Sequence, residues 1–159
     1  MKCQAALAGA VASAAVTITA SATLAFTTVT LTTAAFADMR VTRDLGGEVT
    51  SYIRKFENIR DSGERLVIDG PCLSACTLFT AIVPADQVCV TRWAVLGFHS
   101  ATYYDDARRA FVPTRKGTSL VMRFYPPQIR SWIARHGGLT PSIIALRGRE
   151  LAALYKTCP

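Results

Sequence analysis

The chain has 159 residues and carries 18 Lys and Arg against 11 Asp and Glu, a formal net charge of +7. A chain of this length has room for one compact domain. The basic residues are scattered, without the dense blocks or interleaved aromatic residues of a nucleic-acid-binding surface, so we expect no nucleic-acid partner.

The N-terminus has the features of a secretory signal peptide. A basic start is followed by a long apolar stretch, and no acidic residue occurs before Asp38. Ala35-Phe36-Ala37 matches an A-x-A cleavage site. We therefore predict a signal peptide over residues 1–37 and a domain over residues 38–159 that is periplasmic or secreted. The alternative is an uncleaved membrane anchor, the one case in which we expect contact with a membrane.

The first part of the domain reads as a strand, a helix and a strand. Residues 39–42 are β-like, and apolar residues from Val49 to Ile59 follow one face of a helix. Gly63 is expected to end this helix. The apolar run at residues 66–68 is typical of a buried strand in a parallel sheet.

A second helix and two further strands are expected next. Ser74 is a candidate N-cap for this helix, which Pro84 stops. Residues 87–91 and 94–100 are rich in β-forming residues, and His99 stands at the end of the second stretch.

The C-terminal part is predicted to be helical. Residues 101–117 are polar and without a period, so we interpret them as a loop that borders a site. A helix opens near Pro126-Pro127 and ends at Gly137-Gly138. Residues 142–146 and 149–155 are predicted as further helical segments. The fold class is therefore α/β, with a mostly parallel sheet and a helical C-terminal part.

Four cysteines lie after the leader: Cys72, Cys76, Cys89 and Cys158. An even number in an exported chain favours two disulfides, and four cysteines allow three pairings that the sequence does not distinguish. We place Cys76–Cys89 and Cys72–Cys158 first, because a helix start and the following strand are plausible neighbours. Cys72 and Cys76 have no second close pair of Cys or His residues, which argues against zinc, and we expect no metal.

A serine between a strand and a helix is chemically useful. Its hydroxyl lies beside backbone N–H groups that have no partner within the helix, and such donors can stabilise an oxyanion. Taken singly, Ser74 is interpreted as a helix cap and His99 as a hydrogen-bonded residue at a strand end.

Three motifs in a fixed order change this interpretation. They are Leu45-Gly46-Gly47-Glu48-Val49, Gly70-Pro71-Cys72-Leu73-Ser74-Ala75-Cys76 and Leu96-Gly97-Phe98-His99. Together they resemble the proteolytic subunit of Clp protease, in which a Gly-Gly turn leads into a helix, a serine opens a helix and a histidine ends a later strand. The resemblance covers residues 46–100, is nearest to exported members of the Clp protease/crotonase-like superfamily, and implies a repeated β-β-α core.

The resemblance assigns roles to four residues. Ser74 corresponds to the nucleophile and His99 to the general base. The backbone N–H groups of Gly47 and Ala75 correspond to the oxyanion hole. These roles agree with the chemistry, since a serine hydroxyl needs a neighbouring base and the developing charge needs fixed donors.

The third catalytic residue fits the family less well. The family's acid follows the long helix, and the matching region here offers only Glu150. Asp105 and Asp106, in the stretch after His99, are the alternatives. Loss of the acid lowers the rate of a serine protease by about 10⁴.

Three function hypotheses follow. The first is an exported serine hydrolase that acts on a peptide or ester without any cofactor. The second is a catalytically inactive binding or structural module of the same fold. The third is crotonase-like chemistry on coenzyme A thioesters, which ranks last because an exported chain rarely meets that cofactor. Since proteins of the Clp type often form rings or trimers, the resemblance also implies a homo-oligomer.

Overall fold

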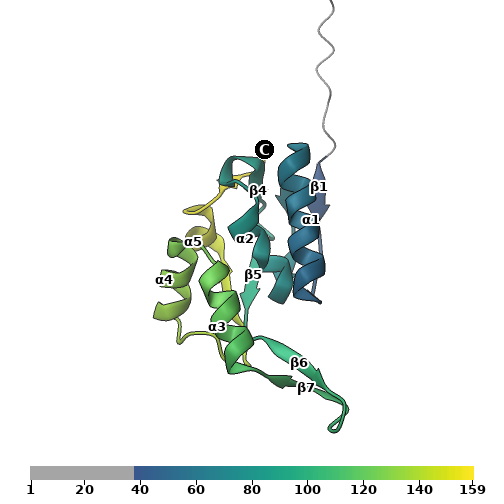
Figure 1. Cartoon of the computed structure of the whole chain (residues 1–159). Helices are drawn as coiled ribbons and strands as arrows, with labels where there is room; N and C mark the ends of the chain where they lie inside the picture. Colours follow the sequence, from purple (N-terminus) through teal and green to yellow (C-terminus); the bar gives the residue numbers. More distant parts are fainter. Residues whose placement is uncertain (1–37) are drawn as a thin grey trace, which may run out of the picture. The chain divides into compact units, whose positions relative to one another are not determined.

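The computed structural model describes residues 38–159, and the predicted leader therefore lies outside the described residues. Figure 1 shows a mixed α/β arrangement of strands and helices. The larger sheet has four parallel strands, which in spatial order are β1 (Met39–Val41), β2 (Leu66–Ile68), β4 (Val88–Val90) and β9 (Lys156–Thr157). The expected parallel sheet is thus confirmed. β2 and β4 are buried along their whole length, which explains their continuous apolar runs.

A second sheet has three strands and carries the site. β3 (Pro71–Leu73) pairs in parallel with β5 (Val95–Phe98), and β5 pairs antiparallel with β8 (Ile144–Arg147). The expected helix at residues 142–146 is therefore wrong. The buried positions of β8 alternate with exposed ones, and a run of four residues is too short to distinguish this period from that of a helix.

Figure 1 shows helices on both sides of the strand β5. α1 (Val49–Ser62) begins directly after the Gly-Gly turn and ends at Gly63, whose φ of 71° is left-handed, as predicted. The remaining helical segments are η1 (Ser74–Leu78), α2 (Phe79–Ile82), η2 (Ala85–Gln87), α3 (Arg115–Phe124), α4 (Pro127–Arg135) and α5 (Gly148–Ala152). The C-terminal part is helical, as expected, except for the strands β8 and β9.

Residues expected to form a loop instead form a β-hairpin. β6 (Thr102–Asp105) pairs antiparallel with β7 (Ala110–Pro113), and the hairpin extends away from the other described elements (Figure 1). Both strands are largely exposed on both faces. Their sequence therefore lacks the alternation of apolar and polar residues by which a half-buried strand is recognised.

Aromatic side chains of the core pack α1 against α2. Phe56 and Phe79 are fully buried, with ring centroids 6.1 Å apart, and Phe79 also lies 5.7 Å from the ring of Tyr155. These contacts hold α1, which starts after the Gly-Gly turn, against the helical segment that follows Ser74. Among residues 38–159, no helix combines the length and apolar character needed to cross a membrane.

Candidate active site around Ser74 and His99

Ser74 occupies a strained turn between β3 and η1. Its φ of 56° is left-handed, a region that costs a residue with a Cβ atom about 1–2 kcal/mol. Only one other non-glycine residue of the described chain, Arg109, has a positive φ. Strained backbone of this kind is concentrated at active sites, where the surrounding structure holds it in place.

Ser74 is not the N-cap that its sequence position predicts. Leu73 occupies the N-cap position of η1, and no side chain caps this helix start. The left-handed backbone places Ser74 one residue further along, as the first residue of η1. A role as helix cap therefore does not account for the serine hydroxyl.

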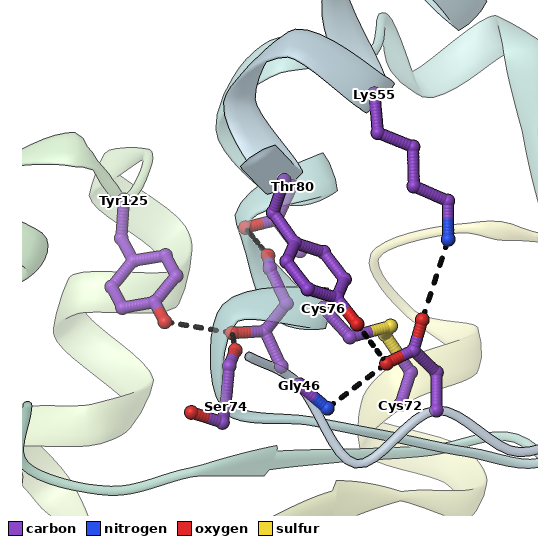
Figure 2. Close-up of a disulfide and its surroundings, with 10 residues drawn as sticks. Gly46, Lys55, Cys72, Ser74, Cys76, Thr80 and Tyr125 are labelled. Carbon is purple, nitrogen blue, oxygen red and sulfur yellow. Dashed lines mark hydrogen bonds and ion pairs between the residues drawn. A yellow bond between two sulfur atoms is a disulfide. The ribbon is translucent and has the colours of Figure 1, made fainter. Parts of the chain in front are cut away.

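The Ser74 turn is held by buried hydroxyl groups. Thr77 Oγ1 donates to the Ser74 carbonyl oxygen over 2.7 Å and lies 2.7 Å from the Tyr125 hydroxyl (Figure 2). Because the single Thr77 proton points to Ser74, the Tyr125 hydroxyl is the donor in the second bond. Burial raises the pKa of Tyr125 to about 12, so this donor stays protonated.

The tautomer of His99 is fixed by its neighbour. His99 follows β5 and is half-buried, and its Nδ1 lies 2.7 Å from the carbonyl oxygen of Ser100. A carbonyl oxygen only accepts hydrogen bonds, so Nδ1 carries the proton and Nε2 offers a lone pair. In the neutral imidazole, Nε2 is therefore the nitrogen that can accept a proton from a serine.

Ser74 and His99 line the same small cavity, of about 70 Å³. Gly47, Ala75 and Ser100 also line it, together with the apolar side chains of Val49, Leu78 and Val121. The hydroxyl of Ser100 is buried and has no hydrogen-bond partner in the described chain. It is available to a polar group that enters the cavity.

The small cavity adjoins a larger open groove, of about 740 Å³, that also includes Ser74 and His99. The far side of this groove is formed by exposed aromatic side chains of the hairpin, Tyr103, Tyr104 and Phe111. A ligand in the groove would therefore place one of its groups in the cavity, next to Ser74 and His99. Within residues 38–159, no hydrogen bond joins Ser74 Oγ to His99.

The Gly-Gly turn lies directly against Ser74. Gly46 has a φ of 84°, and a Cβ atom there would come within 2.6 Å of both the Leu73 carbonyl oxygen and Ser74 Cβ. Only glycine fits this contact. The next residue, Gly47, lines the cavity, and its backbone N–H donates to no acceptor in the described part of the chain.

Ala75 supplies a second candidate oxyanion donor. It is the second residue of η1, so its N–H lies in the first turn, where backbone donors have no partner within the helix. The structure thus brings four of the predicted residues to one cavity: Gly47, Ser74, Ala75 and His99.

The candidate acids lie elsewhere. Glu150, on α5, is exposed, and its Oε1 is 3.9 Å from Nε2 of His136 at a different cavity. Asp105 accepts a hydrogen bond from the Arg108 N–H. In the described residues the Ser100 carbonyl takes the position that a carboxylate holds in a triad. Every residue has a backbone carbonyl, so no residue type in the sequence marks this acceptor and it was not predicted.

Both disulfides are present, but the preferred pairing is wrong. Cys72 pairs with Cys76, with 5.3 Å between their Cα atoms, and Cys89 pairs with Cys158, with a Cα separation of 5.0 Å. Parallel pairing of β4 with the two-residue strand β9 brings Cys158 to Cys89. So short a strand is not visible in the sequence. The Cys72–Cys76 bridge spans Ser74 itself (Figure 2).

Comparisons with known proteins give little further information. No protein family matches the chain. No curated protein matches it either. Among solved structures, it is similar to a ClpP1 mutant from Listeria monocytogenes, with 11% sequence identity, coverage of 74% of this chain and 71% of that chain, and a TM-score of 0.42. A likeness of this size is a partial resemblance in the arrangement of strands and helices, and it does not assign the chain to a family.

Proposed function

We propose that the domain is an exported serine hydrolase that cleaves a peptide or an ester. The observation that carries this proposal is that Ser74 with its left-handed backbone, His99 with its proton on Nδ1, and Gly47 and Ala75 all line one cavity. The backbone N–H groups of Gly47 and Ala75 are the proposed oxyanion donors. The two disulfides support export, because disulfides persist in oxidising compartments.

The proposed reaction begins with attack by Ser74. Ser74 Oγ forms a bond to the substrate carbonyl carbon while His99 Nε2 accepts the hydroxyl proton. The negative charge moves to the carbonyl oxygen, where the N–H groups of Gly47 and Ala75 donate to it. Each such donor typically lowers the barrier by about 3 kcal/mol.

The intermediate then collapses and the leaving group departs. The imidazolium of His99 returns its proton to the leaving amine or alcohol, which leaves an acyl ester on Ser74. Water, deprotonated by His99, hydrolyses this ester and restores the serine. The small cavity favours a short acyl group or a small side chain next to the cleaved bond.

The Ser100 carbonyl would orient His99 during these steps. It keeps the proton on Nδ1 as a carboxylate would, but it carries no full charge with which to stabilise the imidazolium. We therefore expect a slow hydrolase, with acylation rates well below those of enzymes with a complete triad.

Active-site labelling tests the proposal. A fluorophosphonate should label the oxidised protein at Ser74, and Ser74→Ala or His99→Ala should lower the labelling rate by about 10³-fold or more. Ser131→Ala and His136→Ala are matched controls, since both residues are exposed on or just after α4, away from the cavity. Peptide mapping by mass spectrometry locates the label.

A catalytically inactive binding module is the second candidate. The absence of a Ser74–His99 hydrogen bond in the described residues favours it, as does the neutral partner of His99. If the folded, oxidised protein does not react with the fluorophosphonate, the hydrolase proposal is wrong and the groove is to be studied as a binding site.

A further inference from the structure

Asp44 is attached to the strand that leads into Ser74. It lies between β1 and α1, and its backbone N–H donates to the Pro71 carbonyl oxygen over 2.8 Å. Its own carbonyl oxygen accepts from the Leu73 N–H, also over 2.8 Å. These two hydrogen bonds attach the Asp44 backbone to β3, which ends one residue before Ser74.

The Asp44 side chain connects this strand to the Gly-Gly turn and to α1, through the bonds to Gly46 and Lys55 that are drawn as dashed lines in Figure 2. Oδ1 accepts hydrogen bonds from the Gly46 N–H, over 2.9 Å, and from the Tyr52 hydroxyl. Oδ2 lies 3.3 Å from Nζ of Lys55. The Asp44 side chain is only 15% exposed, so these partners replace most of its contact with water.

The carboxylate is ionised and its partners are donors. Burial raises the pKa of Asp44, but the hydrogen bonds from Tyr52 and Gly46 and the charge of Lys55 lower it by more, and the net pKa lies below its ordinary value. Burial, followed by the hydrogen bond to Asp44 and the charge of Asp44, raises the pKa of Tyr52 to about 12.

Of the two amide N–H groups of the Gly-Gly turn, one donates a hydrogen bond to Asp44 and the other has no acceptor in the described residues. The Gly46 N–H donates to Asp44, whereas the following N–H, that of Gly47, has no acceptor in the described chain, and Gly47 lines the cavity. Gly46 lies so close to the Ser74 turn that there is no room for a Cβ atom. A shift of the Gly46 amide would therefore displace Gly47 relative to Ser74.

We propose that Asp44 is a positioning residue of the oxyanion hole, whose carboxylate holds the Gly46 amide so that the Gly47 N–H faces the substrate carbonyl at Ser74. This inference rests on the proposed hydrolase function. Asp44 itself touches no reacting atom. It acts through the geometry of the Gly-Gly turn.

Two substitutions of Asp44 separate positioning from charge. Asp44→Asn keeps an oxygen that accepts from Gly46 and Tyr52, whereas Asp44→Ala removes the acceptor. With p-nitrophenyl acetate as substrate, Asp44→Ala should lower kcat by about 10- to 100-fold with little change in KM, because a displaced donor weakens transition-state binding only. Asp44→Asn should restore most of kcat.

A second measurement reports on the turn without catalysis. Amide hydrogen exchange followed by NMR should be faster at Gly46 in Asp44→Ala than in the parent, and close to the parent rate in Asp44→Asn. Asp38→Ala is the matched control: it also removes an aspartate from an ion pair, here with Arg65 at 2.6 Å, but at the start of β1. It should leave both kcat and Gly46 exchange unchanged.

The outcomes distinguish this inference from the proposed function. If the parent hydrolyses the ester and labels at Ser74 but Asp44→Ala has the same kcat, the hydrolase stands and the positioning role is wrong. Equal losses in Asp44→Asn and Asp44→Ala would also overturn it, since charge rather than geometry would then matter. If the parent neither labels nor hydrolyses the ester, both proposals fail.

Discussion

At the scale of single residues, the site depends on two backbone features. The left-handed φ of Ser74 turns the chain from β3 into η1, and the Ser100 carbonyl fixes the tautomer of His99. Both features belong to the backbone, so the residue types in the sequence do not indicate them. The Ser74 turn also carries a cost in stability, which can be measured.

We predict that Ser74→Gly is more stable than Ser74→Ala. Glycine removes the left-handed strain of about 1–2 kcal/mol at a cost of about 0.5–1 kcal/mol in chain entropy, so the difference should be about 1 kcal/mol in the free energy of unfolding. Urea denaturation measures it. Ser119, exposed within α3, is the control: there alanine should be more stable than glycine by a similar amount. The same order at both positions would show that Ser74 is not strained.

At the scale of elements, α1 determines where the Gly-Gly turn ends. Its N-cap is Glu48, whose carboxylate accepts hydrogen bonds from the N–H groups of Thr50 and Ser51 over 2.8 and 2.7 Å. Hydrogen bonds from the side chains of Thr50 and Ser51, followed by those from their N–H groups, lower the pKa of Glu48 from 4.5 to about 2. The cap follows Gly47 directly and thus stabilises the helix start that borders the groove.

We predict that Glu48→Gln reduces the acid sensitivity of the fold. Because the pKa of Glu48 is lower in the folded state, its contribution to stability is fully present above pH 4.5 and is lost as the pH falls toward 2. The melting temperature of the parent should therefore fall more steeply over this window than that of Glu48→Gln. Glu64→Gln is the control, since the Glu64 carboxylate makes no hydrogen bond or ion pair within the described chain. Parallel pH profiles of Glu48→Gln and the parent would contradict this role.

The sequence predicts well those elements whose burial requires a periodic or continuous run of apolar residues. The apolar face of α1 and the continuous apolar runs of β2 and β4 follow from contacts with the core. The hairpin of β6 and β7 is exposed on both faces, and β8 is defined by pairing with β5, nearly fifty residues earlier in the sequence. Such long-range pairing is decided by tertiary structure, so local patterns do not reveal it.

For the site, the sequence predicts the residues that line the cavity but not the neighbouring groups that hold them in place. Ser74, His99, Gly47 and Ala75 meet at one cavity as the motifs imply. His99 Nδ1 lies at the Ser100 carbonyl and Glu150 lies at another cavity, so the third catalytic residue stays a prediction. Asp44 stands next to the Gly-Gly motif, but its contacts with the turn and α1 depend on β3 lying alongside, and these contacts appear only in the structure.

At the scale of the whole molecule, two disulfides have different roles. The Cys72–Cys76 bridge closes a short loop around Ser74, with a sequence separation of 4. The Cys89–Cys158 bridge joins β4 to the C-terminal segment across a separation of 69. The first acts on the site, and the second holds the larger sheet together.

We predict that the long bridge contributes more to stability. In the chain-entropy model, closing its loop is worth about 4 kcal/mol, against about 2 kcal/mol for the short loop. The double variant Cys89→Ser/Cys158→Ser should therefore unfold at a lower urea concentration than Cys72→Ser/Cys76→Ser. The variant without the short bridge should in turn lose more of its fluorophosphonate labelling, because the Ser74 turn is no longer clamped. A larger loss of stability from the short bridge would contradict the entropic account.

The short bridge also has a consequence for oxidative folding. Closing a loop of a few residues costs little entropy, so Cys72 and Cys76 meet readily while the chain is still unfolded. Cys89 and Cys158 are 69 residues apart, so closing their loop costs more entropy, and the pairing of β4 with β9 brings them together. Once the first pair has formed, only one partner remains for each of the other two cysteines of the described residues. Early closure of the small ring thus reduces the three pairings of these four cysteines to one and disfavours scrambled isomers.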